Sequence, residues 1–170
     1  MTHELRDHLL DWLRDAHAME QQAEQMLRMQ ASRIEHYPQV KARIEQHIDE
    51  TCQQQHLVAR CIERLGGSPS AVKDLAGKAM AFGQAVAGMA SADEIVKGLM
   101  ASYVFEHMEI ASYTALIAAA DAAGDAETRG TCESILVQEK VMAQWLHEHL
   151  PGVVGDFLAR DATPSTEAKR

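Results

Sequence analysis

Apolar residues recur at every third or fourth position through four long segments of the chain, which is the spacing of one face of an α-helix. The segments run from residue 2 to about 31, from 38 to about 65, from about 94 to 123 and from about 126 to 149. Ala, Met, Leu, Gln and Glu dominate them, and these residues favour helix over sheet. The pattern predicts an all-α protein built on four long helices.

Turn and capping residues mark the ends of these segments. Pro38 suits the first turn of the second helix, and the run Gly66–Pro69 ends that helix. The run Ser91–Glu94 has the spacing of a capping box, with Ser followed three residues later by Glu. Gly124 is expected to close the third helix, and the fourth is expected to stop before Pro151.

Three further segments complete the predicted domain plan. Residues 70 to about 89 are rich in Ala and Gly, and we expect a short connecting helix that crosses the bundle. Residues 153–158 are expected to form a short apolar lid. The plan is therefore one helical-bundle domain over residues 1–160, followed by a polar, disordered tail over residues 161–170.

Composition and charge restrict the classes of partner. Among the 170 residues, 46% are hydrophobic, which is enough for one domain with a core, and the net charge is −9. This charge argues against binding to nucleic acid or to an anionic membrane surface. No apolar run reaches transmembrane length and no signal-peptide pattern is present, so we expect a cytoplasmic protein. Cys52, Cys61 and Cys132 have no motif spacing and are expected to be buried thiols.

Five acids occupy positions in the apolar stripes, where a hydrophobic residue would be expected. The third stripe shows this most clearly: Ile95, Leu99, Ser102, Glu106, Glu109, Tyr113, Leu116 and Ala120. A carboxylate on a buried face costs free energy unless it is protonated, hydrogen-bonded or bound to a cation. The five acids are Glu20, Glu50, Glu106, Glu109 and Glu139.

The spacing of four of these acids predicts that they meet at one level. Glu20 and Glu50 are about equally far from the turn near residue 35, and Glu109 and Glu139 are about equally far from Gly124. Equal distances from a turn place residues of antiparallel helices at equal height. Any one of these acids could instead lie solvated at the edge of its stripe. Five in register would repel strongly, and two divalent cations would nearly neutralise them.

Four stretches of the chain resemble the ferritin-like superfamily, and within it the YciE/YciF family of small bacterial stress-associated proteins. They are Leu13-Arg14-Asp15 through Glu20-Gln21-Gln22, His47-Ile48-Asp49-Glu50-Thr51 with Gln54, Glu106 through Tyr113, and Leu136 through Lys140. The resemblance covers roughly residues 5–150. It implies a ferritin-like antiparallel four-helix bundle with an extra helix, a homodimer, and a rubrerythrin-like dimetal site.

The chain departs from the usual ferritin-like ligand pattern, which has Glu-x-x-His on two helices. Here Gln53 and Met142 stand where the two histidines would be, and a thioether is a poor ligand for a hard cation. His17 and His47 each lie three residues before a core acid and could compensate as weak ligands, or could hold a carboxylate by a hydrogen bond. The second role is favoured for His47. Gln53, Gln54 and Tyr113 are further candidates for this supporting role.

The leading functional hypothesis is a dimetal-carboxylate protein that holds two divalent iron or manganese ions, with Glu20, Glu50, Glu106, Glu109 and Glu139 as ligands and with Glu50 and Glu139 best placed to bridge. It would react with peroxide or dioxygen, or handle iron, in oxidative or general stress. No nucleophile–base arrangement or phosphate-binding loop is present, so we assign no catalytic residue. The alternative is a metal-free helical interaction or stress-protective protein, which the missing histidines favour. A ferritin-type storage shell is a weaker third hypothesis.

Overall fold

The computed structural model describes residues 3–69, 92–163, 166 and 168. These residues form four α-helices: α1 (His3–Arg33), α2 (Pro38–Arg64), α4 (Glu94–Ala122) and α5 (Ala126–Asp161). The prediction of an all-α bundle is confirmed for this part of the chain. The predicted connecting helix over residues 70 to about 89, and Ser91 of the predicted capping box, lie outside the described residues.

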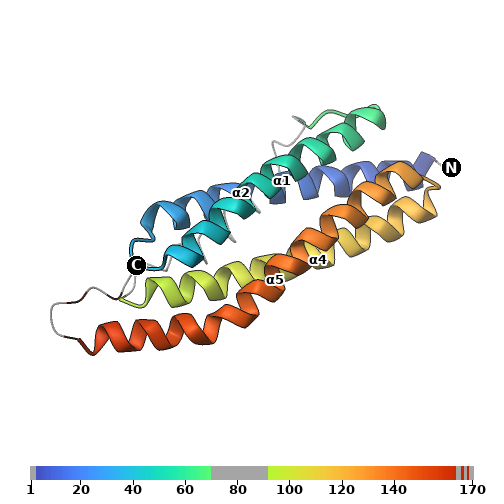
Figure 1. Ribbon diagram of the computed structural model, residues 1–170. Coiled ribbons are helices and arrows are strands. Elements are labelled where there is room, and N and C mark those ends of the chain that lie inside the picture. The colour runs from blue at the N-terminus through green and yellow to red at the C-terminus, as the bar shows by residue number, and fades with distance from the viewer. Residues whose placement is uncertain (1–2, 70–91, 164–165, 167, 169–170) are drawn as a thin grey trace.

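The helices form two antiparallel hairpins, α1–α2 and α4–α5, packed against each other (Figure 1). Helix α1 contacts α2 and α4, while α5 contacts α4 and α2. Every pair of neighbouring helices is therefore antiparallel, and the end of α2 and the start of α4 lie at opposite ends of the bundle (Figure 1). This is the arrangement of a ferritin-like bundle.

The apolar core has two parts, with polar side chains between them. On α5, Ile135 belongs to the cluster near the α4–α5 turn and Met142 to the cluster near the α1–α2 turn. Glu139 lies between these two residues and is fully buried. The predicted buried stripe of α4 is confirmed from Ile95 to Ala120, including both of its acids.

The predicted end of the last helix was wrong. Helix α5 continues through Pro151 to Asp161, where we expected a stop and a separate lid over residues 153–158. Proline removes one backbone hydrogen bond and commonly kinks a helix, and α5 bends along its length (Figure 1). Val153 and Phe157 still pack on the core beyond the proline. Their burial compensates for the lost hydrogen bond, so the helix is kinked but not ended.

Polar contacts at the two ends fix the hairpins relative to each other. Arg64 of α2 donates to the Asp125 carboxylate and, at 2.7 Å, to Thr128 Oγ1 at the start of α5. Arg33 of α1 forms an ion pair with Glu94 at the start of α4. As predicted, α4 ends just before Gly124, whose φ of 68° is in the left-handed region that favours glycine.

Two observations concern the surface and the predicted tail. None of the described helices combines the length and the apolar composition that a membrane crossing requires.

Within residues 161–170, the carbonyl of Ala168 accepts a hydrogen bond of 2.7 Å from the hydroxyl of Tyr37, which lies between α1 and α2.

Candidate metal centre

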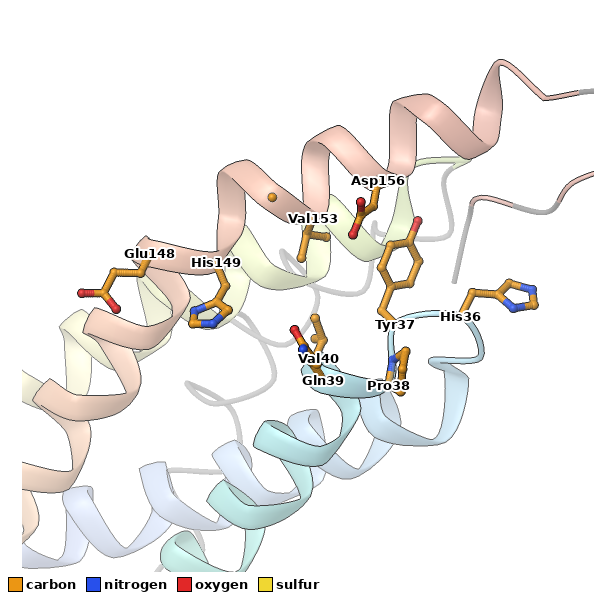
Figure 2. A pocket seen from close by; sticks show the side chains of 10 residues that line it. His36, Tyr37, Pro38, Gln39, Val40, Glu148, His149, Val153 and Asp156 are labelled. Atoms are coloured by element: carbon orange, nitrogen blue, oxygen red, sulfur yellow. The ribbon is translucent and has the colours of Figure 1, made fainter.

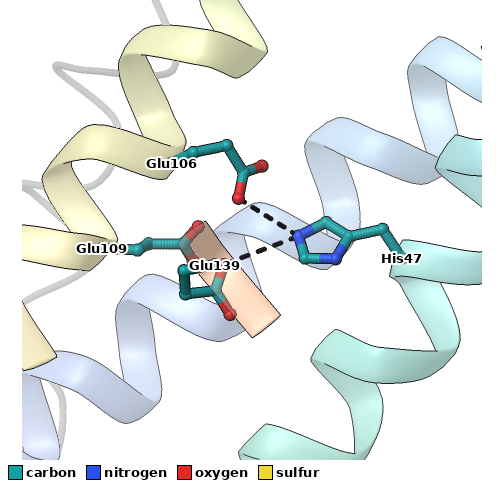
Figure 3. A group of neighbouring side chains, drawn as sticks. All are labelled: His47, Glu106, Glu109 and Glu139. Atoms are coloured by element: carbon teal, nitrogen blue, oxygen red, sulfur yellow. Dashed lines mark ion pairs between the residues drawn. The ribbon is translucent and has the colours of Figure 1, made fainter. Parts of the chain in front are cut away.

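Side chains from three helices meet in the polar layer between the two apolar clusters. Helix α2 contributes His47, α4 contributes Glu106 and Glu109, and α5 contributes Glu139 (Figure 3). Each of them offers one nitrogen or oxygen atom, and these atoms lie within 4.8 Å of one another. All four side chains are at most 1% exposed. The distances and the burial are those of a site that could hold a metal ion.

Glu20 brings a carboxylate from the fourth helix, α1, to the same group. It is fully buried, and its charge interacts with those of Glu139 and Glu109. The hydroxyl of Tyr113, one turn after Glu109 on α4, donates a hydrogen bond to Glu20. Four of the five predicted acids and the predicted tyrosine therefore lie together in the interior.

The carboxylates in this group have more acceptor atoms than the neighbouring side chains can satisfy. One oxygen of each of Glu20 and Glu109 is buried without a hydrogen-bond partner, and the corresponding oxygens of Glu106 and Glu139 have only the imidazole of His47 nearby, at 3.3 and 3.6 Å. Burial raises the pKa of Glu20 and of Glu109 well above the ordinary value, and neighbouring carboxylates raise it further. Burial raises the pKa of Glu106 to about 7, although the hydrogen bond with His47 acts in the opposite direction. The protein thus holds acids that a bound cation would favour in their ionised form.

His47 is the basic group that faces these carboxylates. Its Nε2 lies 3.3 Å from a Glu106 oxygen and 3.6 Å from a Glu139 oxygen (Figure 3). Its Nδ1 lies 2.7 Å from Glu50 Oε2. Burial alone would lower the pKa of His47, but the hydrogen bonds with Glu106, Glu139 and Glu50 outweigh it and raise the pKa well above the ordinary value.

Glu50 does not reach the group of buried acids. Its side chain is 21% exposed and lies on the outer side of the His47 ring, where it also accepts from Gln46 at 2.9 Å and from Arg43 at 3.3 Å. The pKa of Glu50 is lowered, because the hydrogen bond with His47 and the charge of Arg43 outweigh burial. Thr51, the next residue, takes the buried position on α2.

The remaining candidates are divided between this group and other places. Gln54 is fully buried, and its amide nitrogen donates to Glu139 and, at 2.9 Å, to Gln138. Gln53 is exposed on the opposite side of α2. His17 is buried, and its Nδ1 has no hydrogen-bond partner. Burial and the nearby His56 lower the pKa of His17. Neither Gln53 nor His17 belongs to the four-residue group around His47.

The donors present suit a divalent cation that prefers oxygen and nitrogen ligands. Four carboxylates from three helices and one imidazole face one another, and one oxygen of each of Glu20 and Glu109 has no partner. Carboxylate and imidazole ligands suit iron and manganese. The thioether of Met142 is a poor ligand for these ions, and Met142 is not a member of the four-residue group around His47. On chemistry and on burial, the residues present fit a metal centre.

Comparison with known proteins identifies the family. The model for the family described as "Domain of unknown function (DUF892)" matches residues 4–159. A protein of Xanthomonas campestris pv. campestris is 48% identical over 94% of this chain and 99% of its own, with a TM-score of 0.81. A protein of Rhodopseudomonas palustris described as YcfI, a putative structural protein, is 25% identical over 86% of this chain and 94% of its own, with a TM-score of 0.72.

A third solved structure relates the fold to metal-carboxylate proteins. It comes from Bacillus anthracis str. Ames and is described as ferritin-like, diiron-carboxylate. It is 21% identical over 88% of this chain and 99% of its own, with a TM-score of 0.72, so its likeness concerns the fold alone. The resemblance drawn from the sequence motifs is confirmed. The chain belongs to the DUF892 family and has the fold of the ferritin-like superfamily.

Proposed function

We propose that this protein holds two divalent iron or manganese ions in the buried group formed by Glu20, Glu106, Glu109, Glu139 and His47. The observation that supports this most strongly is a set of four buried carboxylates that share one basic group, His47, and of which two, Glu20 and Glu109, each keep an oxygen without any partner. One imidazole cannot neutralise four carboxylates, and uncompensated buried charge is costly. A relative of the same fold, from Bacillus anthracis, is described as a diiron-carboxylate protein.

His47 and Glu50 take roles in this proposal that differ from those expected from the sequence. His47 offers Nε2 to the centre, while Glu50 accepts from Nδ1 at 2.7 Å. A carboxylate behind a metal-bound histidine fixes its tautomer and ring orientation and increases its basicity. Glu50 would therefore orient the ligand His47 and would not itself bind an ion. Gln54 and Tyr113 would hold Glu139 and Glu20 in the same way, each by one hydrogen bond.

The proposed activity is a reaction with a small oxidant, or the handling of iron, during oxidative or general stress. A bound pair of redox-active ions would supply electrons to peroxide or dioxygen. The protein's own residues would exclude bulk water, since all five proposed ligands are at most 1% exposed. The proposed cytoplasmic location is supported by the cysteines, because Cys52, Cys61 and Cys132 are all free.

A metal-free interaction or stress-protective protein is the second candidate. It is favoured by the partners that some of the acids already have: His47 for Glu106, Tyr113 for Glu20 and Gln54 for Glu139. Raised pKa values of Glu20 and Glu109 would let protons take the place of cations. The Rhodopseudomonas palustris relative is described as a putative structural protein, and this description favours a metal-free role for that relative.

Metal analysis distinguishes the two candidates. We expect about two iron or manganese ions per chain in protein purified without chelator from supplemented cultures. His47→Leu should weaken metal binding at least about tenfold, the lower end of the range for loss of a group that supports a ligand, and the metal content should fall accordingly. His56→Leu is the matched control, because His56 is an exposed histidine of the same helix, and it should leave the content unchanged.

Two results would reject the metal centre and leave the metal-free candidate. One is wild-type protein without iron or manganese after supplementation of the cultures. The other is equal metal content in the His47→Leu and His56→Leu variants, since adventitious surface binding does not require a buried histidine.

We also propose that the protein is a homodimer that pairs through the outward faces of α4 and α5. Between Lys97 and Asp121, α4 carries two acids, Glu106 and Glu109, which are both buried, and one exposed histidine, His107, but no lysine, arginine or aspartate. A helix that is apolar on all sides is normally covered. The outward faces expose large apolar side chains that are 52–61% accessible: Met100, Val104, Val137 and Val141. With a net charge of −9, two copies would repel through most other surfaces.

Val104→Glu should therefore convert the dimer into a monomer. A carboxylate on each side of the interface adds like-charge repulsion and desolvation cost, while Val104 is 57% exposed in one chain and its replacement should leave the fold intact. Light scattering after gel filtration measures the mass. Met29→Glu, a change at a 51% exposed position on α1, should leave the dimer intact. Monomeric wild-type protein, or a Val104→Glu variant of unchanged mass, would contradict the pairing.

A further inference from the structure

A pocket of about 460 Å³ lies at the end of the bundle farthest from the α4–α5 turn, between α5 and the start of α2. One wall is formed by the ring of Tyr37 with Gln39 and Val40, and the opposite wall by α5 from Glu148 to Asp156 (Figure 2). The volume is in the range of small-molecule sites. None of the proposed metal ligands lines this pocket. Its contents are therefore a question separate from the metal centre.

The charge of the lining selects against anions. Two carboxylates, Glu148 and Asp156, line the pocket together with His36 and His149, and no lysine or arginine does, although the charge of Arg160, outside the lining, also acts on Tyr37. Asp156 extends toward the ring of Tyr37 on the opposite wall (Figure 2). Glu148 accepts a hydrogen bond of 2.5 Å from Gln144 and points away from the other labelled side chains (Figure 2). Asp156 is thus the carboxylate that is best placed to meet a ligand.

His149 provides a second acceptor. Its ring stacks on Trp145, with centroids 4.0 Å apart and an interplanar angle of 16°. Its Nδ1 lies 2.8 Å from the backbone carbonyl of Trp145, which can only accept, so Nδ1 carries the proton. In the neutral ring, Nε2 then has a free lone pair. The stack and the backbone hydrogen bond fix the ring on the α5 side of the pocket (Figure 2).

The distance between these two acceptors excludes a single small cation. Asp156 and His149 are seven residues apart on α5, a rise of roughly 10 Å. One metal ion cannot contact both groups. Between the two acceptors, the wall of the pocket is formed by Gly152 and Val153. Gly152 has no side chain and leaves space for a ligand, while Val153 is apolar and 6% exposed. Val40 lines the opposite wall. The matching ligand is elongated, with a hydrogen-bond donor at each end and an apolar middle.

We propose that this pocket binds a linear aliphatic diamine or polyamine. One ammonium group pairs with the Asp156 carboxylate beside the Tyr37 ring, and the other donates to His149 Nε2. The methylene chain lies along Gly152 and Val153. Aliphatic amines are protonated at neutral pH, as lysine is, and the net charge of −9 attracts such ligands to the protein.

The test is a titration of the full-length chain, freed of paramagnetic iron and manganese by chelator, with 1,5-diaminopentane, followed by the indole N–H signals of the two tryptophans. Trp145 stacks on His149 and should shift in a saturable manner, while Trp12, 46% exposed on α1, should not. We expect 1-aminopentane to bind at least about tenfold more weakly, and 1,5-pentanediol not to shift Trp145, because each charged hydrogen bond lost corresponds to about a factor of ten.

Two variants test the assigned groups. Asp156→Asn and His149→Phe should each weaken diamine binding at least about tenfold, since each removes one acceptor and phenylalanine keeps a ring on Trp145. Asp161→Asn removes an exposed charge of the same helix outside the pocket and should leave binding unchanged. Melting curves of all the variants check that they fold.

Three outcomes overturn the proposal. The first is the absence of a saturable Trp145 shift at millimolar diamine. The second is equal weakening by Asp156→Asn and Asp161→Asn, which would show general attraction to a negatively charged protein. The third is equal affinity for the diamine and the monoamine, which would show that the two acceptors do not act on one ligand.

Discussion

Replacing Glu109 by leucine should stabilise the metal-free protein and abolish its stabilisation by manganese. Glu109 is fully buried among carboxylates, one of its oxygens has no partner, and its pKa is raised by burial and by the charge of Glu20. Replacing buried ionic groups with apolar residues of similar volume often stabilises a protein by about 1–4 kcal/mol. At pH 8 and with chelator present, we expect a gain of that order. It corresponds to roughly 2–4 °C in melting temperature for each kcal/mol.

The opposite sign is expected when metal is added. Wild-type protein should gain about 4 kcal/mol at a manganese concentration 1,000 times the dissociation constant, while the Glu109→Leu variant should gain little. Glu63→Gln changes an exposed acid of α2 and should behave as wild type in both conditions. A loss of stability of Glu109→Leu in chelator would show that the charge of Glu109 is compensated in the metal-free protein. A rise in its melting temperature with manganese equal to that of wild type would show that Glu109 is not a ligand.

The second large effect is on the pH dependence of stability. Without metal, the free energy of unfolding should be greatest near pH 5 and should fall by several kcal/mol by pH 8. Each extra proton held by the folded state changes this free energy by about 1.4 kcal/mol per pH unit. In the folded state, the pKa values of Glu20, Glu109 and His47 are raised well above their ordinary values, and that of Glu106 is raised to about 7.

Above pH 5, each of these four raised pKa values makes the free energy of unfolding fall as pH rises. A group whose pKa is raised by folding contributes stability below its unfolded pKa, and this contribution is lost as pH rises through the folded pKa. For Glu106 the loss lies between its ordinary pKa of 4.5 and about 7. For His47 it begins above 6.5. The pKa values of Glu50 and Asp125 are lowered, so their contributions disappear only as pH falls toward acid. The pKa of His17 is also lowered, so this one group opposes the trend, but only below its ordinary pKa of 6.5.

Manganese should reverse this dependence, because ions displace protons from the same carboxylates and bind more tightly as pH rises. Melting temperatures measured from pH 5 to pH 8, in chelator and in excess manganese, should therefore diverge as pH increases. Parallel curves would mean that the ion does not bind at the groups that hold the protons. Glu109→Leu should flatten the chelator curve, because it removes one of those groups.

Periodicity was sufficient to predict the four helices and most of the buried acids. All eight positions of the predicted α4 stripe, from Ile95 to Ala120, are buried in the structure, including Glu106 and Glu109. On α2 the same rule failed at one position. After His47, both Glu50 and Thr51 continue a spacing of three or four residues, and the fold buries Thr51. A period of 3.6 residues cannot separate these two neighbours without knowledge of the helix crossing.

The role of His47 and the length of α5 depend on tertiary contacts. The sequence placed His47 three residues before a predicted core acid, but it could not show which ring nitrogen faces the buried acids. Nε2 faces them because Glu50, on the outer side of the ring, pairs with Nδ1. Pro151 is a local signal for a helix end. Helix α5 passes it because Val153 and Phe157 pack on the core near the α1–α2 turn, a contact between segments more than 100 residues apart.

The most direct test of the metal centre is an anomalous-scattering experiment on crystals grown with manganese. Two peaks should lie among the carboxylates of Glu20, Glu106, Glu109 and Glu139, with one of them next to His47 Nε2 and with Glu50 still on Nδ1. The contrary result is a map without a peak in this layer, in which Nε2 of His47 remains paired with Glu106. In that case the buried acids would be held by protons and by His47, and the metal-dependent function would be rejected.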